Sequence, residues 1–324
     1  MMCTNLCPTP LSWSSSSLTL NNSKSHLLSQ NPQIPSKSII SSNNNNNINT
    51  SIITNKYTHF VVNTNFNRFQ TSMADSWDKN ESTISINEFN PFELNDMSDF
   101  SLVASPRGSI SICGFGSLLS ERSARSTFPE LCNFRVARLR GFRRVFAHVA
   151  PIFFERGIAK PETKEISSLS VEPYEGEELI VTLFEIQKSE VPSFMERELE
   201  FRFLAVLPET LEGKAFKNAA VLCTRYSDEE FFNVRCQGSK EVFHQHYGRY
   251  NIDKIWRDDV FPCRTYLRHC VLAAKNLGDA AHNNFLDHTY LADRHTTIRQ
   301  YLATTGAGIM EEEPPESLKM RYGG

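Results

Sequence analysis

The first 74 residues of this 324-residue sequence contain no aspartate or glutamate. The chain also has no CxxC pair and no stretch near the roughly eighteen apolar residues of a membrane helix. Its eight cysteines are spread widely, which argues against a dense disulfide framework and suits a reducing compartment where they remain thiols. The sequence therefore predicts a body that is not embedded in a membrane.

The net charge of -3 conceals an uneven distribution. Only four of the 34 basic residues lie before Asp75, so the remainder carries 30 basic against 37 acidic side chains, or about -7. Binding to nucleic acid without sequence preference needs Lys and Arg to replace condensed counterions. The acidic body predicts no nucleic-acid partner.

Residues 1–74 are rich in Ser, Asn and Thr, include an asparagine run at 43–47, and cannot support a packed core. Without acids, and without the compact apolar core of a secretory signal, this leader resembles a plastid transit peptide and predicts a plastid (chloroplast) location. A disordered extension without function is one alternative. Translation starting at Met73 is another, and would place the protein in the cytoplasm.

Residues 75–108 turn abruptly acidic and polar, which predicts a disordered linker. The folded body is expected over 109–228. A helical C-terminal extension, ending in a flexible tail, is expected over 229–324.

The body alternates short apolar runs with turns and later shows helical periodicity. The expected strands are 110–113, 134–139, 142–149, 166–171, 179–186, 201–207 and 219–224, and the expected helices are 121–128, 189–199, 229–255, 265–276 and 288–303. The predicted fold class is α+β, with a small curled sheet or β-barrel and flanking helices.

A glycine-serine loop, Gly114-Phe115-Gly116-Ser117-Leu118, follows the first expected strand and precedes a short helix. In this context glycines let backbone N–H groups point at an anion. No third glycine completes a dinucleotide fingerprint and no Lys completes a Walker loop. Taken alone, the loop is equally typical of a structural turn and of a ligand cradle.

An acidic cluster, Glu196-Arg197-Glu198-Leu199-Glu200, ends the helix expected over 189–199. Such a cluster is usually a solvated face. If Phe194 faces inward, Glu198 lies one turn onward on the same face, whereas Glu196 and Glu200 point elsewhere. A buried carboxylate there would have a raised pKa and could transfer protons, which makes Glu198 the candidate acid.

Several segments together resemble the γ-glutamylcyclotransferases. The run Cys113 to Leu118 resembles their Tyr-Gly-Ser-Leu loop, and Leu139 to Phe146 resembles the Gly-aromatic-x-Arg-x-Phe strand of the ChaC-type, glutathione-degrading branch. That branch has an Arg-Gly turn, which Arg156-Gly157 resembles, and a Gly-Val-aromatic strand, whose place is taken here by 178–186. It also has a Leu-Asp-x-Arg-Glu motif, which 194–198 resembles and whose final Glu is the catalytic acid-base. The resemblance runs from about Ile110 to Leu207.

The resemblance implies a lyase-type cyclisation that releases 5-oxoproline from a γ-glutamyl compound such as glutathione, without metal or cofactor. It implies Glu198 as the catalytic residue and residues 114–118 as the substrate-binding loop. The sequence departs from the family at Phe115, where the loop tyrosine is expected, at Met195, where the Asp is expected, and after Glu198, where Gly-Gly-Tyr is missing. These departures leave open a non-catalytic ligand-binding or regulatory module on the same fold.

Two rival sites are also present in the sequence. His244-Gln245-His246, with Asp258, Asp259, Cys263, His269 and Cys270 downstream, could hold a metal for a hydrolase, although a zinc site usually shows tighter pairing. A Cys–His nucleophile pair using Cys263 or Cys113 is also conceivable, although free cysteines are most often core residues.

Overall fold

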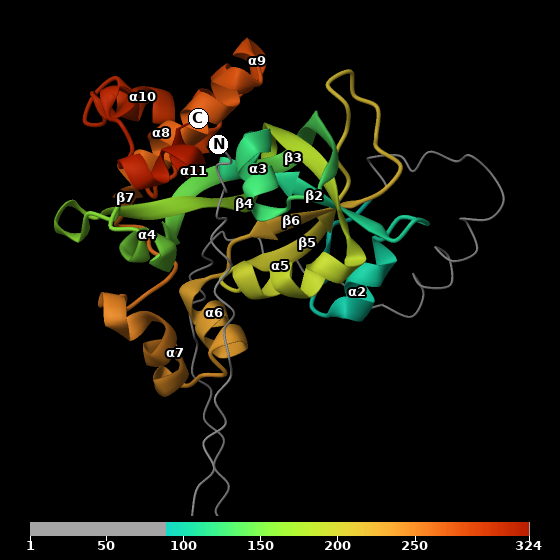
Figure 1. Ribbon diagram of the computed structural model, residues 1–324, viewed down its shortest axis with the longest axis horizontal. Coiled ribbons are helices and arrows are strands. Elements are labelled where there is room, and N and C mark those ends of the chain that lie inside the picture. The colour runs from blue at the N-terminus through green and yellow to red at the C-terminus, as the bar shows by residue number, and fades with distance from the viewer. Residues whose placement is uncertain (1–88, 324) are drawn as a thin grey trace, which may run out of the picture. The chain divides into compact units, whose positions relative to one another are not determined.

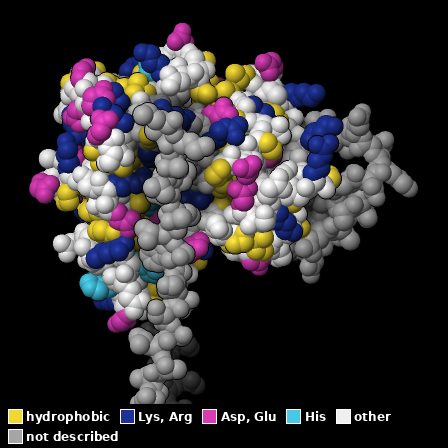
Figure 2. Space-filling view, viewed as in Figure 1, with side chains coloured by type: hydrophobic (Ala, Val, Ile, Leu, Met, Phe, Trp, Pro, Cys, Tyr) yellow, Lys and Arg dark blue, Asp and Glu magenta, His cyan; other side chains and the backbone are white. Residues whose placement is uncertain are grey.

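The structure, a computed structural model, describes residues 89–323 of the chain. The predicted transit peptide and the first part of the predicted linker lie outside the described residues. Among the helices of residues 89–323, none is both long enough and apolar enough to cross a membrane. In Figure 2, acidic and basic side chains are mixed over the face in view.

One mixed sheet forms the centre of the described residues. Its strands are β1 (Phe92–Leu94), β2 (Ser109–Gly114), β3 (Cys132–Val149), β4 (Glu165–Gln187), β5 (Arg202–Val206), β6 (Ala220–Thr224), β7 (Phe261–Pro262) and β8 (Thr289–Tyr290). They lie in the order β1-β5-β6-β2-β4-β3-β8, and β7 pairs with β4 beside this path. Four pairs are antiparallel, and three are parallel: β2–β6, β3–β8 and β4–β7. The long antiparallel ribbon of β3 and β4 is the most extensive strand pairing of the sheet.

Helices cover both faces of this sheet (Figure 1). They are α2 (Met97–Leu102), α3 (Glu121–Thr127), α4 (Pro151–Glu155), α5 (Val191–Arg197), α6 (Asp228–Arg235), α7 (Lys240–Tyr247), α8 (Arg264–Asn276), α9 (Asp279–Asp287), α10 (Ile298–Leu302) and α11 (Lys319–Tyr322). In Figure 1, α2 and α5 lie on one side of the sheet, and α8 and α10 lie on the other. The predicted α+β class is confirmed.

The strand path is open, because its end strands β1 and β8 do not pair with each other. One isolated bridge brings the chain just beyond β5 against β3. There, the backbone N–H of Arg138 donates to Glu209 O at 2.8 Å, and that of Glu209 donates to Arg138 O at 2.9 Å. In the described residues the sheet is therefore open rather than the predicted curled sheet or β-barrel, and this bridge is an isolated contact beside the strand path.

Two hydrophobic clusters lie on opposite faces of the sheet, because successive strand residues point to opposite sides. In β4, Leu183 packs in the cluster under α8, whereas its neighbour Phe184 packs in the cluster under α2 and α5. Four of the buried residues of α8 in the first cluster form a stripe at helical spacing: Leu267, Cys270, Val271 and Ala274. Both faces of the central strands are buried, so each helix layer is needed to complete the core.

The predicted linker is wrong for residues 89–108. There β1 pairs with β5, and α2 begins at the cap Asp96, whose side chain accepts from the backbone of Ser98 and Asp99. Leu94 and Phe100 are fully buried. Apolar residues at a few positions anchor this segment despite its acidic composition, because burial of each side chain contributes about 1.5–3 kcal/mol.

Several predicted elements also change in extent. The strands expected at 134–139 and 142–149 are one strand, β3, which continues through a register shift near Gly141, where φ is +78°. The strands expected at 166–171 and 179–186 are likewise one continuous strand, β4. The helix expected over 229–255 divides into α6 and α7 around Gln237 and Gly238, both with positive φ.

The helix predicted at 288–303 is largely wrong. Thr289–Tyr290 forms β8 beside β3, and helix returns only over Ile298–Leu302. Between them Asp293 accepts from the backbone N–H groups of His295 and Thr296, which fixes a turn. Strand pairing and this turn outweigh the helical periodicity. Helix α9, just before, was not predicted.

Candidate functional site

The glycine-serine loop lies where the sequence placed it, between β2 and α3. Gly114 ends β2, Gly116 precedes a short 3-10 helix at Ser117–Leu119, and Ser120 caps α3 by accepting from the N–H of Ser123. A Cβ on Gly114 would lie 2.6 Å from Thr182 Oγ1 and 2.8 Å from Leu118 Cβ. Only glycine fits at that position.

Two side chains behind the loop hold its carbonyl groups. Thr182 Oγ1, on β4, donates to Leu118 O at 2.8 Å. Arg144 Nε, on β3, donates to Phe115 O at 2.8 Å. Gly114, Phe115 and Gly116 are buried, whereas Ser117 and Leu118 are half-buried. The loop therefore presents its second half to the outside and is anchored at its first half.

Arg144 is completely buried. Its other nitrogens donate to Ile180 O and, at 3.2 Å, to Asn284 Oδ1. Burial lowers the pKa of Arg144 to about 10. Within the described part of the chain, the titratable groups that act on its pKa are the Cys113 and Cys270 thiols, which burial keeps neutral, rather than a carboxylate. A positive charge thus lies directly behind the loop.

Glu198 follows α5 as its C-terminal cap. As the sequence pattern required, Phe194 is buried, and the Glu198 side chain is 27% exposed whereas Glu196 is exposed. Burial raises the pKa of Glu198, against the opposing charges of Arg197 and Arg321. Arg197 Nε lies 3.3 Å from Glu198 Oε1. A carboxyl with a raised pKa is suited to proton transfer.

Strand β6 connects the acid with the loop. Burial raises the pKa of the Cys223 thiol in β6, and the negative charge of Glu198 raises it further. Cys113, in β2, acts on the same thiol. Because β2 and β6 are parallel, with Ile112 opposite Val221, both strands end on the same side. The charge of Glu198 thus reaches Cys223 in β6, the parallel neighbour of the strand that leads into the glycine-serine loop.

No family model and no curated protein sequence matches this chain. Among solved structures, the chain is similar to a γ-glutamyl cyclotransferase at 20% identity and a TM-score of 0.30, over 45% of this chain and 88% of that one. It is similar to an uncharacterized protein from Homo sapiens at 21% identity and a TM-score of 0.29, over 47% and 90% of the two chains. It is also similar to a protein from Arabidopsis thaliana at 12% identity and a TM-score of 0.29, over 46% of this chain and 97% of that one. Each match covers less than half of this chain.

Glu200 is a second perturbed carboxyl that the sequence pattern did not single out. Burial raises its pKa to about 7, and the hydroxyl of Tyr247 donates to Glu200 Oε1 at 3.1 Å. The charge of Glu198 raises it further. Tyr247 belongs to α7, almost fifty residues away in sequence, so local helical spacing gave no signal of this pairing.

Residues from the C-terminal part of the chain also reach the loop. A Cβ on Gly116 would lie 2.6 Å from the hydroxyl oxygen of Tyr266, in α8. Arg321, in α11, donates to Ser123 O at 3.3 Å and to Thr127 Oγ1 at 3.0 Å, both in α3. Its charge also lowers the pKa of Glu198. The apolar stripe of α8 indicated a packed helix, but no sequence signal assigned it to the loop.

The two rival sites are not assembled. His244 and His246 are exposed on α7, and residues 89–323 contain no group of three or more His, Cys, Asp or Glu placed to hold a metal ion. Asp259 instead pairs with Lys164 and Arg257. Burial raises the pKa of the Cys113 and Cys263 thiols to about 12, which opposes formation of a nucleophilic thiolate.

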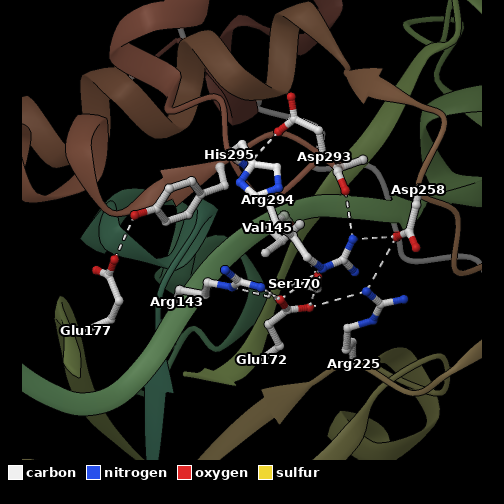
Figure 3. A network of polar contacts seen from close by, with 12 residues as sticks. Arg143, Val145, Ser170, Glu172, Glu177, Arg225, Asp258, Asp293, Arg294 and His295 are labelled. Carbon is white, nitrogen blue, oxygen red and sulfur yellow. Dashed lines mark hydrogen bonds and ion pairs between the residues drawn. The ribbon is translucent and has the colours of Figure 1, made fainter. Parts of the chain in front are cut away.

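A polar network on the far part of the β3–β4 ribbon also escaped the sequence analysis (Figure 3). Glu172 accepts from Arg143 at 2.6 Å, from Arg294 at 3.0 Å and from Arg225 at 3.3 Å. Arg225 and Arg294 also pair with Asp258. These contacts join β3 and β4 to the segment after β6 and to the turn that follows β8.

Proposed function

We propose that this protein is a γ-glutamyl cyclotransferase with Glu198 as its general acid/base. The observation that carries the proposal is that Glu198, at the end of α5, is a partly buried carboxyl with a raised pKa whose charge acts on Cys223 in β6, the parallel neighbour of the strand that leads into the glycine-serine loop. An acid whose pKa is raised towards neutrality accepts and returns a proton most effectively.

The reaction needs little beyond such an acid and a binding loop. The α-amine of a γ-glutamyl compound attacks its own γ-carbonyl carbon, forming a C–N bond that closes the five-membered ring of 5-oxoproline. The amide bond to the leaving amine or peptide then breaks. Glu198 takes the proton from the attacking ammonium and returns it to the leaving nitrogen. Holding the chain folded converts a loose encounter into a near-attack geometry.

The loop would hold the α-carboxylate of the substrate. Ser117 and Leu118 are its half-exposed residues, and the Arg144 charge behind Phe115 favours an anion in front of the loop. Glutathione, the substrate of the ChaC-type branch that the sequence resembles, is the first compound to test.

The test measures 5-oxoproline released by the purified full chain from glutathione, γ-glutamyl amino acids and γ-glutamyl amines. Glu198→Gln should lower release by about 10²–10⁴-fold while the protein stays folded. Glu196→Gln, on the exposed side of the same helix, is the matched control and should retain activity. Absence of product from the whole panel would reject the proposal. If Glu200→Gln lost activity while Glu198→Gln kept it in full, Glu200 and not Glu198 would be the general acid/base.

A non-catalytic ligand-binding module is the second candidate, favoured by the hydroxyl of Tyr266 that lies against Gly116. This contact packs the buried half of the loop against α8, and Arg197 holds Glu198 in an ion pair. This candidate predicts that γ-glutamyl compounds raise the melting temperature without forming product. Product formation at catalytic rates would exclude it.

For the leader, we propose plastid import, on the basis of the acid-free composition of residues 1–74. A fluorescent protein fused after residue 74 should enter plastids in plant cells. A fusion of residues 73–324 should stay in the cytoplasm, and an identical distribution of the two would contradict the proposal.

A further inference from the structure

Asn284, in α9, joins the C-terminal part of the chain to the strands behind the loop. Its Oδ1 accepts from the N–H of Ile180 at 2.7 Å and from Arg144 Nη1 at 3.2 Å, and its Nδ2 donates to Glu178 O at 2.9 Å. The side chain is only 9% exposed, and both ends of its amide are engaged. The hydrogen bonds of this amide therefore fix α9 against Arg144 of β3 and against the backbone of β4.

The next residue of α9 also contacts the buried charge. The Arg144 guanidinium carbon lies 5.3 Å from the centre of the Phe285 ring, within cation–π range. A buried charge is costly unless hydrogen bonds or a counter-charge compensate it. Here the compensation comes from two backbone carbonyls, of Phe115 and Ile180, and from α9. The charge of Arg144 thus stays uncancelled.

That uncancelled charge acts on the loop through one peptide unit. Arg144 donates to Phe115 O, and the same peptide group carries the N–H of Gly116. A charge-assisted hydrogen bond to a carbonyl polarises its peptide group, which makes the N–H a stronger donor. The effect is large because the surroundings of Arg144 are dry.

We propose that Arg144 is a positioning residue that adapts the loop to a carboxylate, and that Asn284 holds Arg144 in place without neutralising it. This inference rests on the proposed function above. It makes α9, outside the segment 110–207 that resembles the cyclotransferases, part of the binding site. It also explains why an amide, rather than a carboxylate, pairs with the buried arginine.

The decisive variant is Asn284→Asp in the full chain. The carboxylate keeps the acceptor for Arg144 and Ile180 and adds the missing counter-charge, although it loses the hydrogen bond to Glu178 O. Because an Asp beside a buried arginine forms an ion pair, a purely structural role for Asn284 predicts little change in ligand affinity. The positioning role predicts that the KM for the γ-glutamyl substrate rises by about tenfold while kcat changes less than about twofold.

Asn283→Asp is the matched control, because it adds the same charge at the neighbouring, exposed position of α9. It should leave KM within about twofold of the wild-type value. An unchanged KM in Asn284→Asp, or an equal rise in Asn283→Asp, overturns the inference. If Asn284→Asp does not fold, the KM of Arg144→Lys is compared with that of Arg143→Lys. Arg143 is the control because it pairs with Glu172 away from the loop.

Calorimetric binding of 5-oxoproline and glutamate separates this inference from the proposed function. Binding that weakens in Asn284→Asp but not in Asn283→Asp supports the inference even if the wild type makes no product. Product formation with equal binding and KM in all variants removes the inference alone. A wild type that neither binds these carboxylates nor makes product refutes both.

Discussion

The hydroxyl of Tyr266 fills the space beside the Cα of Gly116, within 2.6 Å of the position of a Cβ. Gly116→Ala should therefore destabilise the protein by about 1–3 kcal/mol, because a methyl group forces the tyrosine or the loop to move. Tyr266→Phe removes the contacting oxygen and should recover part of the loss in the double variant. Urea unfolding of the four proteins measures the coupling, and strictly additive effects would contradict this close contact.

Glu200 should make stability depend on pH. Its folded-state pKa is raised to about 7, so the folded protein binds the proton more tightly than the unfolded chain. Stability contributed by the protonated carboxyl is complete below the unfolded pKa and is lost as the pH rises through about 7. Glu200→Gln should therefore be more stable than the wild type at pH 8, by about 1–2 kcal/mol.

Denaturant unfolding at pH 4.5 and pH 8 gives the comparison, with Glu196→Gln as the exposed control. A Glu200→Gln variant whose stability falls with pH as steeply as that of the wild type would show that Glu200 is not responsible.

Glu172 should be among the most important polar residues for stability. Glu172→Gln removes the charge that faces Arg143, Arg225 and Arg294. With these guanidinium groups partly buried, we expect a loss of about 3 kcal/mol in the free energy of unfolding. Glu175→Gln, exposed three residues further along β4, should change it by less than about 0.5 kcal/mol. Equal effects at the two positions would show that the network is energetically neutral.

Tyr322 should anchor the C-terminal segment. It is 3% exposed, its ring packs 5.7 Å from that of His269, and its hydroxyl accepts from Arg156. Tyr322→Ala should cost about 3 kcal/mol through lost burial. Met320→Ala changes a side chain of the same helix that is 74% exposed, and should cost far less. Thermal melting of the two variants decides whether α11 contributes to the core.

The sequence predicted most accurately those features that depend on a single helix, strand or loop. The strand, loop and helix around Gly114, and the inward face shared by Phe194 and Glu198, depend on spacing within a few residues. Helix α8 was similarly evident from its apolar stripe. These features are local, so composition and periodicity were sufficient.

The remaining features depend on contacts between distant segments. The acidic composition of 89–108 hid the few apolar residues, such as Phe100, that attach it to the core. The sequence gives no sign of the role of Asn284, because a helical asparagine can fix Arg144 only once the fold brings the two side chains together. The perturbed state of Glu200 likewise requires Tyr247. No periodicity reports which distant side chain will be the partner.

The positions of β7 and β8 bear on how this protein is made. Strands β3 and β4 are complete by residue 187, yet β7 at Phe261–Pro262 and β8 at Thr289–Tyr290 pair with them later in the chain. During synthesis, the edge that β7 will cover stays without this partner until 74 further residues have been added (261 − 187), and the edge that β8 will cover waits for 102 (289 − 187). Unpaired strand edges invite association with other chains. The sheet is therefore completed only after residues 289–290 have been synthesised, and a ribosome stalled near residue 260 would present an intermediate with unpaired strand edges that is prone to association.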